Sequence, residues 1–351
     1  MSSVVKKQHY VWRKYLQKWI GNNNKLFVLR KNTFGTQKAI ESAEVEKVGF
    51  EKFFYDISGF SEKDINFYSQ FLTHIQINEP IFFDLDINML LNNAKDRDFI
   101  ETKVMAQLEN LDNKYNFLEK LANKDYTFYQ DTKVKTIMDE LNRKIFFEII
   151  GIEYEIPTEF YDFINKILQN PEILSSTDNI KFKFHEYLCA QYFRSPKVFY
   201  NQKSIIENLK NEKEAIKDID YRFFANLFLI YASTKMAFSI THNFKTVLEI
   251  LENKTQLNFI TCDSPVINLT GKDFKNPTVF YYPITPKIAI KLKIYDLFYD
   301  INNDINNKVI IINDDNINEI IELNKIVFKN SYNEIYSNNE ETLKSFLWSQ
   351  H

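Results

Sequence analysis

Residues 278–293 read TVFYYPITPKIAIKLK, two runs of apolar, aromatic and β-branched residues separated by proline and lysine. Short β-strands bounded by turn-forming residues typically have this composition. Two nearby stretches share it: LNFITCDSPVINL at 257–269 and KVIIIN at 308–313. The chain from Leu257 onward is therefore predicted to be rich in strands. A last helix is predicted from Asp315 to Asn330, where apolar residues recur at helical spacing.

The portion of the chain before these strands has a helical pattern, from Phe99 to Asn253. Apolar residues recur there at steps of three and four, which places them on one helix face: Val104, Leu108, Leu111, Tyr115, Leu118. Ile137, Leu141, Ile145 and Ile149 repeat at every fourth residue. The segment from Tyr221 to Leu251 is predicted to form one or two buried helices, with these rings and side chains in the core: Phe223, Phe224, Leu227, Phe228, Tyr231.

The N-terminal block combines a helix candidate, His9 to Ile20, with a strand candidate, KLFVLRK at 25–31. Because a lone strand is not stable, this strand is expected to join the C-terminal sheet. The predicted fold class is α+β, a helical middle flanked by N- and C-terminal strand-forming regions that share a mostly antiparallel sheet. The predicted organisation is a single domain over 1–351, with a helical portion at 99–253 and a β-rich portion with a terminal helix at 257–351.

The composition favours a soluble protein of the cytoplasm. The chain is 44% hydrophobic and 26% charged, and its only cysteines are Cys189 and Cys262. Secreted disulfide scaffolds carry more cysteines, and the N-terminus lacks an apolar signal core. The longest apolar stretch, Phe223 to Ile240, is interrupted by polar residues and a lysine, whereas a membrane span needs about 20 mostly apolar residues. A buried helix is the better interpretation, and no membrane association is expected.

Charge is distributed unevenly along the chain, although the net charge is only −3. The first 40 residues hold nine Lys or Arg and no acid, so the remainder has 35 basic and 47 acidic residues. Such asymmetry points to a nucleic-acid or nucleotide partner bound through the basic N-terminus. The alternative is that these cations pair with the acidic remainder or simply face water.

The sequence also resembles, segment by segment, the bacterial domain-of-unknown-function family 4238. The segments that carry the resemblance are HYVWRKYLQKW (9–19), VEKVGFEKFFYD (45–56), QYFRSPKVF (191–199), FITCDSPV (259–266), YYPITPKIAIKL (281–292) and LNKIVFKNSYNEIYS (323–337). The family opens with His-Tyr-Val-Pro, ends with an Asn-bearing helix, and has Ser-Asp-Asn before its central proline. Trp12, Cys262 and Ser264 depart from that pattern. The resemblance implies an architecture and a set of polar residues, but no reaction and no cofactor.

Several common chemistries are excluded by spacing. The six glycines lie at least nine residues apart, so neither a P-loop nor a GxGxxG phosphate cradle is present. No HExxH, GxSxG, RxxxxH or Cys/His cluster occurs, and no metal site is predicted. Asp84 and Asp86 form a DxD that could hold Mg²⁺, although two solvated acids at a strand end are the simpler interpretation.

The candidate site residues are polar residues within the family-like segments. His9 is a candidate general acid or base, because an imidazole titrates near neutral pH; the alternative is a histidine at a helix start. Arg13 lies one turn further on and could share its face. Arg194 could bind a phosphate or carboxylate, or could simply close a helix. Asp263 follows an apolar strand and is the second catalytic candidate; the alternative is a turn in which its carboxylate accepts backbone N–H bonds.

Three functions remain open at this point. The first is a hydrolase or nuclease-like phosphodiesterase acting on a phosphate-bearing substrate, in a setting such as bacterial defence. His9 and Asp263 would then approach each other, with Arg13 or Arg194 nearby. The second is a noncatalytic module that binds nucleic acid, nucleotide or protein, and the third is an interaction scaffold. His185 and Glu186 are a further acid/base pair of lower interest.

Overall fold

A computed structural model describes residues 7–21, 24–31, 40–52, 63, 66, 70, 108–129, 180–212, 232–241, 244–269, 278–296 and 307–348. The repeat from Ile137 to Ile149, the aromatic run from Phe223 to Tyr231 and the Asp84/Asp86 pair lie outside the described residues.

The larger sheet has five strands in the order β10-β5-β9-β8-β7. Their bounds are β5 Phe244–Asn253, β7 Ile267–Asn268, β8 Thr278–Thr285, β9 Ile288–Asp296 and β10 Lys308–Ile312. All neighbours are antiparallel except β10 and β5, which run parallel. The prediction of a strand-rich chain after Leu257 is confirmed, and the two runs of residues 278–293 pair with each other as β8 and β9.

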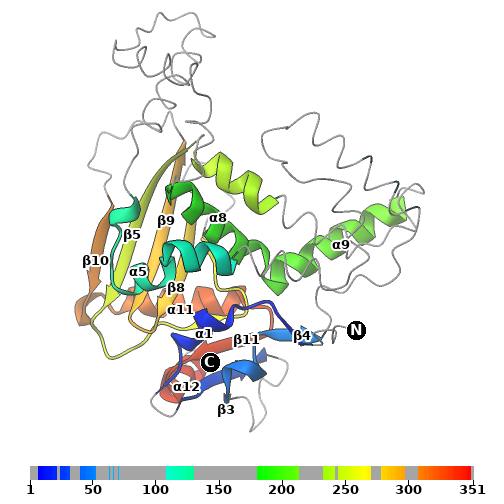
Figure 1. Cartoon of the computed structure of the whole chain (residues 1–351). Coiled ribbons are helices and arrows are strands. Elements are labelled where there is room, and N and C mark those ends of the chain that lie inside the picture. Colours follow the sequence, from blue (N-terminus) through cyan, green and yellow to red (C-terminus); the bar gives the residue numbers. More distant parts are fainter. Residues whose placement is uncertain are drawn as a thin grey trace, which may run out of the picture.

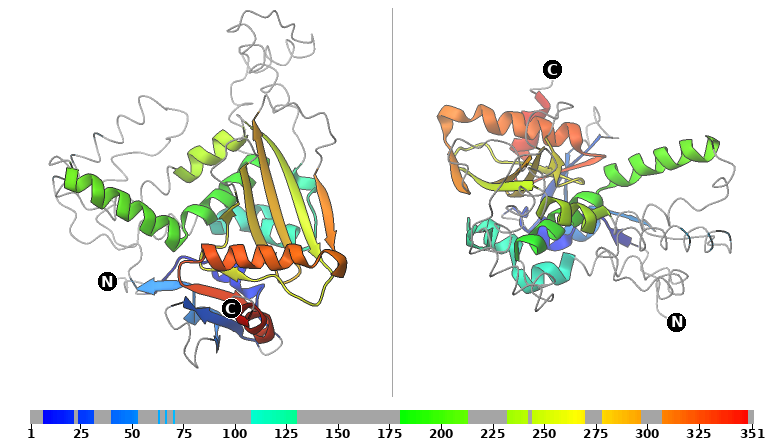
Figure 2. Two further views of the ribbon diagram at one scale, coloured as in Figure 1. Left: turned by 180° about the vertical axis from the view of Figure 1, so that it is seen from behind. Right: turned by 90° about the horizontal axis from the view of Figure 1, so that it is seen from above.

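Helices cover both faces of this sheet. On one side lie α5 (Phe117–Ala122) and α8 (Ile180–Phe193), and on the other lies α11 (Asn318–Asn330), as Figures 1 and 2 show. Because helices cover both faces, the strands β5 and β8 bury most successive side chains instead of alternating buried and exposed ones, whereas the edge strand β10 is mostly exposed.

The prediction of a helix up to Leu251 is wrong at its C-terminal end. A helix spans residues 232–241, but Phe244–Asn253 form β5, which pairs with β9 from Phe244–Asp296 to Glu252–Ile288. Periodicity alone cannot separate a helix from a strand that is buried on both faces, because both show near-continuous apolar residues. The rest of the described middle is helical: 108–115, α5, α8, α9 (Pro196–Glu212) and the 3₁₀ turn η4 (Thr127–Tyr129).

The smaller sheet joins distant parts of the chain in the order β3-β2-β11-β6, all antiparallel. Its strands are β2 Leu26–Arg30, β3 Ile40–Ala43, β6 Thr261–Cys262 and β11 Glu334–Ser337. The expectation that the N-terminal strand joins the C-terminal β region is thus confirmed. The partner strand β11 lies within the segment that resembles a final helix, so α11 ends at Asn330 and is followed by this strand and by α12 (Glu340–Trp348).

The N-terminal helix is shorter than predicted. α1 spans Arg13–Gln17, whereas His9 ends the strand β1 (Lys7–His9), which pairs with β4 (Phe50–Lys52). The amides of Tyr10 and Val11 both donate to the carbonyl of Gly49 and so hold the chain in a turn before the helix begins. The remaining short elements are the 3₁₀ turns η2 (Val45–Lys47) and η7 (Asp314–Asn316).

Aromatic side chains connect α1 to both sheets. The Tyr15 ring stacks on Tyr282 of β8 at a centroid distance of 5.1 Å. Its hydroxyl group lies 2.5 Å from Thr261 Oγ1 of β6 and donates to the carbonyl of Pro283 at 2.6 Å. Tyr15 is fully buried, and so is the neighbouring Trp19. Many of the aromatic residues therefore serve the core.

Candidate functional site

Asp263 follows β6 directly, and its carboxylate is fully buried. It accepts three backbone hydrogen bonds, from the amides of Tyr332 (2.7 Å), Asn333 (2.5 Å) and Glu334 (2.8 Å). The Asp263 amide donates in turn to the carbonyl of Glu334 at 2.9 Å. Asp263 thus acts on the turn between α11 and β11, some 70 residues away, rather than on a local turn before its proline.

The environment of Asp263 changes its acidity. Burial raises the pKa of the carboxyl group from 3.8 to about 6, although the three amide hydrogen bonds favour the ionised form. Between these two pH values the folded chain binds more protons than the unfolded chain, so stability falls as the pH rises.

We expect this carboxyl group alone to lower the free energy of unfolding by about 2 kcal/mol between pH 4 and pH 7. The measurement is urea unfolding of wild type and Asp263→Asn across that pH range. The stability difference between the two proteins should shrink as the pH rises, since only wild type carries the titrating group. A difference that does not change with pH would contradict the raised pKa.

Among the described residues, none of the other predicted site residues has a hydrogen bond or ion pair with this carboxylate. Arg194 is buried, and its Nη2 donates to the main-chain carbonyl of His9 at 3.0 Å. Arg13 is exposed on α1. No hydrogen bond or ion pair joins His9 to Asp263 within the described ranges. Burial raises the pKa of Tyr10, and the charges of Glu334 and Asp263 raise it further. The residue after His9 therefore lies near Asp263.

Glu334 organises the same region and was not recognised from the sequence. Its Oε1 accepts from Arg30 Nε at 2.9 Å, and its Oε2 accepts from the Gly49 amide (3.0 Å) and the Tyr336 hydroxyl (2.6 Å). It therefore joins β2, the turn before β4, and its own strand β11. The family resemblance assigns its segment, NSYNEIYS, to a final helix, whereas residues 334–337 form a strand in which all four residues are buried.

Three of the nine basic N-terminal residues form ion pairs with acids from the rest of the chain within the described ranges. The ion pairs are Lys14 with Asp112, Lys18 with Glu119, and Arg30 with both Glu41 and Glu334. This agrees with the alternative in which the N-terminal cations neutralise the acidic remainder.

His185 and Glu186 have structural partners. The His185 ring is buried, with Nε2 2.7 Å from the Tyr129 hydroxyl and Nδ1 2.7 Å from Thr241 Oγ1. Since the Thr241 hydroxyl donates to the Ala237 carbonyl, Nδ1–H donates to Thr241 and Nε2 accepts from Tyr129. Glu186 pairs with Lys183 at 2.7 Å.

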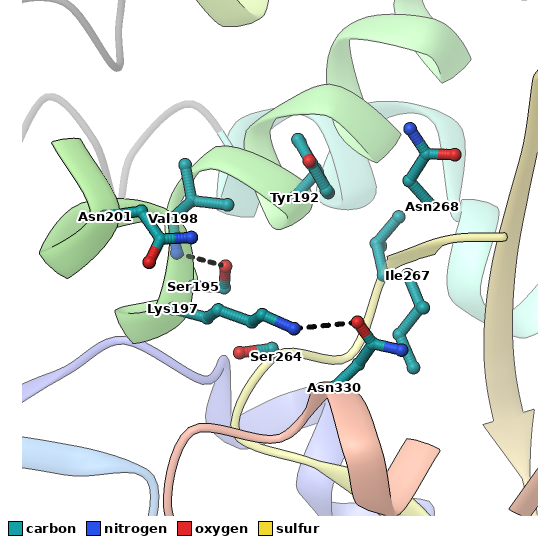
Figure 3. A pocket seen from close by; sticks show the side chains of 10 residues that line it. Tyr192, Ser195, Lys197, Val198, Asn201, Ser264, Ile267, Asn268 and Asn330 are labelled. Carbon is teal, nitrogen blue, oxygen red and sulfur yellow. Dashed lines mark hydrogen bonds between the residues drawn. The ribbon is translucent and has the colours of Figure 1, made fainter. Parts of the chain in front are cut away.

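A pocket lies where the start of α9, the segment after Asp263 and the end of α11 meet (Figure 3). We call it the α9 pocket. Its volume is about 190 Å³, and ten residues line it: Tyr192, Ser195, Lys197, Val198, Asn201, Ser264, Val266, Ile267, Asn268 and Asn330. Three of the family-like segments, 191–199, 259–266 and 323–337, each contribute residues to this lining.

The first turn of α9 forms one wall of the pocket. Ser195 caps the helix, because its Oγ accepts from the Val198 amide at 3.3 Å, as Figure 3 shows. The Lys197 ammonium group crosses to α11 and donates to Asn330 Oδ1 at 2.7 Å. An ammonium group has three hydrogens, so two further donors remain for a ligand. The wall thus combines a positive charge with the positive end of a helix dipole.

The segment after Asp263 forms another part of the lining, and it carries a buried hydroxyl group with no partner among the described residues. Ser264 is only 4% exposed, and its Oγ has no hydrogen-bond partner among the described residues. A buried polar group that stays unpaired costs free energy, so such a group in a pocket wall indicates a ligand or solvent position. Its side chain is one of those that line the pocket (Figure 3).

Two of the predicted site residues are direct sequence neighbours of residues that line this pocket. They are Arg194 and Asp263, whereas the pocket is lined by the residues that follow them, Ser195 and Ser264. Both selected side chains are buried, and their hydrogen bonds go to main-chain groups outside the lining: Arg194 to the His9 carbonyl, and Asp263 to the amides of residues 332–334. A usable signal was Ser-Pro-Lys at 195–197, since serine followed by proline is a typical start of a helix.

Among the described residues, no cluster of three or more His, Cys, Asp or Glu side chains could hold a metal ion. Nor is any helix in those ranges long and apolar enough to cross a bilayer.

The comparisons with known proteins give one result. Residues 155–341 match the model of the family described as "Protein of unknown function (DUF4238)", which is just over half of the chain. The match contains the pocket and four of the six family-like segments, while 9–19 and 45–56 lie before it. No curated protein and no solved structure matches the chain. The chain therefore belongs to the DUF4238 family, as its central and C-terminal segments indicated.

Proposed function

We propose that the protein binds a phosphate-bearing ligand in the α9 pocket. The observation that carries this proposal is the unpartnered, buried hydroxyl of Ser264, which lines the pocket together with Lys197. A phosphate oxygen can accept from both groups at once, and also from the Ser195 hydroxyl, whose hydrogen is not used in capping the helix.

Helix geometry supports an anion rather than a cation in this position. α9 has 17 residues, so the partial positive charge at its start is fully developed. Pro196 opens the helix, and the Ser195 and Lys197 side chains flank it. No carboxylate lines the pocket, and its only ionisable side chains are those of Lys197 and Tyr192. Anion binding at helix N-termini follows from these features.

The buried Asp263 beside Ser264 opposes an anion when ionised, and two lysines offset it. Lys31 donates to the Ser331 carbonyl at 2.7 Å. Burial lowers the pKa of Lys31, and the negative charge of Asp263 offsets part of that lowering. The positive charge of Lys197 also lowers the pKa of Lys31, so these two ammonium groups lie close to each other. Glu334 is a second acid near Asp263, and its own charge is paired with Arg30.

Hydrolysis of the ligand, with His9 and Asp263 as acid and base, has less support than binding. Neither residue lines the pocket, and the Asp263 carboxylate already accepts three amide hydrogen bonds. General acid or base catalysis needs a titratable group within hydrogen-bond reach of the reacting atoms. A noncatalytic phosphate-binding module fits the lining better than a phosphodiesterase.

The cytoplasm remains our proposed compartment. Cys189 and Cys262 are both buried and free, and burial raises the pKa of each thiol, which keeps it in the unreactive protonated form.

We expect ribose 5-phosphate and pyrophosphate to bind wild type, and Lys197→Met to weaken both by about 10-fold or more. Loss of a hydrogen bond to a charged partner has this magnitude. Ser264→Ala should weaken binding about 10-fold by the same reasoning. Isothermal titration calorimetry at pH 7.5 measures the affinities.

The matched control is Lys325→Met, which removes a surface lysine paired with Glu322 on α11 and should leave affinity unchanged. The proposal fails if neither phosphate compound binds wild type, or if Lys197→Met binds as well as Lys325→Met does. Turnover of a nucleotide or nucleic acid by wild type that is lost in a folded His9→Ala variant would favour the phosphodiesterase instead.

A further inference from the structure

A pair of stacked tyrosines stands beside the α9 pocket. The rings of Tyr200 on α9 and Tyr332 after α11 are stacked, with centroids 4.9 Å apart and planes at 16°. The Tyr200 hydroxyl donates to Glu51 Oε2 at 2.6 Å, which fixes that ring. Tyr332 is 49% exposed, one of the few large apolar side chains of the described residues that are so open to solvent.

The stack and the pocket share their two supporting elements. Lys197 lies three residues before Tyr200, about one turn along α9. Its partner Asn330 lies two residues before Tyr332. The Lys197–Asn330 hydrogen bond and the Tyr200–Tyr332 stack are therefore neighbouring contacts, each joining α9 to residues at or just after the end of α11. The exposed ring stands next to the Lys197 wall of the pocket.

The size of the pocket limits what it can enclose. Pockets that enclose a drug-sized ligand have volumes of about 300–1,000 Å³. The α9 pocket, at about 190 Å³, can hold a phosphate group with part of a sugar but no purine ring as well. The rest of a larger ligand must leave through the opening and lie on the surface beside it.

Hydrogen bonds fix the backbone at Tyr332, so its ring can serve as a rigid platform on which another ring stacks. The Tyr332 amide donates to Asp263 Oδ1 at 2.7 Å, and Ser331 Oγ donates to the Phe328 carbonyl at 2.7 Å. Tyr200 supports one side of the ring. An aromatic ring that is already fixed loses little conformational entropy when a second planar group stacks on it.

We propose that the ligand of the α9 pocket is a nucleotide, with its phosphate beside Lys197 and Ser264 and its base stacked on the exposed side of Tyr332. This inference rests on the proposed function and adds the chemical class of the ligand. Every base has a π-face, so the platform selects nucleotides over sugar phosphates without selecting one base strongly. Base–aromatic stacking of this kind corresponds to roughly 5- to 100-fold in affinity.

The test compares AMP with ribose 5-phosphate, which is AMP without its base, on wild type, Tyr332→Ala and Tyr332→Phe by calorimetry. Wild type should bind AMP at least 5-fold more tightly than ribose 5-phosphate. Tyr332→Ala should lose that preference and leave ribose 5-phosphate affinity unchanged, while Tyr332→Phe should keep it. Because the Asp263 contact uses the backbone amide, both variants retain it.

The outcomes separate the two proposals. If neither compound binds wild type, the phosphate site and the nucleotide inference both fall. If both bind equally and Tyr332→Ala changes neither affinity, the phosphate site stands and the nucleotide inference is overturned. A preference for AMP that survives in Tyr332→Ala also overturns the platform, because the base would then be recognised elsewhere.

Discussion

Asp263→Ala is expected to lower the free energy of unfolding by about 3–6 kcal/mol. The substitution leaves the amides of Tyr332, Asn333 and Glu334 without their acceptor, and each buried unsatisfied donor costs about 1–3 kcal/mol. The turn between α11 and β11 then keeps only its backbone contacts with β6 and the residue after it. Chemical denaturation at pH 7, followed by far-ultraviolet circular dichroism, measures the loss.

The matched control for Asp263 is Asp315→Ala, which removes an exposed aspartate from η7 and should change stability by no more than about 0.5 kcal/mol. The loss of unfolding free energy in Asp263→Asn should lie between those of Asp263→Ala and Asp315→Ala. The asparagine oxygen can accept from part of the turn, while its NH₂ group faces the remaining donors. A loss below about 1 kcal/mol in Asp263→Ala would show that water replaces the carboxylate.

Asn324→Ala is expected to cost about 2–4 kcal/mol of unfolding free energy. Asn324 lies on the buried face of α11, where its Oδ1 accepts from the Ile260 amide at 3.0 Å and its Nδ2 donates to the Asn258 carbonyl at 2.9 Å. Both backbone groups belong to the segment before β6 and become unpaired in the variant. The side chain thus docks the helix onto the segment that leads into β6.

Glu322→Ala is the control for Asn324, since it removes a surface ion pair with Lys325 from the same helix, and such pairs contribute about 0–1 kcal/mol. Asn324→Asp keeps the side-chain volume and changes only the hydrogen bonds. The carboxylate can accept from the Ile260 amide but cannot donate to the Asn258 carbonyl. We expect it to be at least as destabilising as Asn324→Ala at pH 7. Equal stability of all three variants would contradict the docking role.

Much of the fold could be predicted because the C-terminal strands carry their own signals. Residues 278–293 form two runs of apolar, aromatic and β-branched residues on either side of a Pro-Lys turn, and β8 and β9 follow from this local composition. β5 could not be recognised in the same way, because its burial on both faces removes the alternation. β11 was hidden for another reason: only four residues long, it directly follows a strongly amphipathic helix.

The candidate site was predictable only in part. Sequence reasoning identified Asp263 as a special residue and gave the acceptance of backbone N–H bonds as an alternative to catalysis, which is the role that its contacts show. It could not show that the donors lie in residues 332–334, since that contact depends on the path of the chain. The pairing of Lys197 with Asn330 and the stacking of Tyr200 on Tyr332 depend on it in the same way.

The smaller sheet has a consequence for synthesis on the ribosome. β2 pairs with β11, and the Arg30–Glu334 contact spans 304 residues of sequence. At about 5–20 residues per second, β2 must wait roughly 15–60 s for its partner to be made. During that time its apolar face, with the side chains of Leu26 and Val28, has no native cover from β11. The nascent chain should therefore be a chaperone client whose last folding step follows the completion of translation.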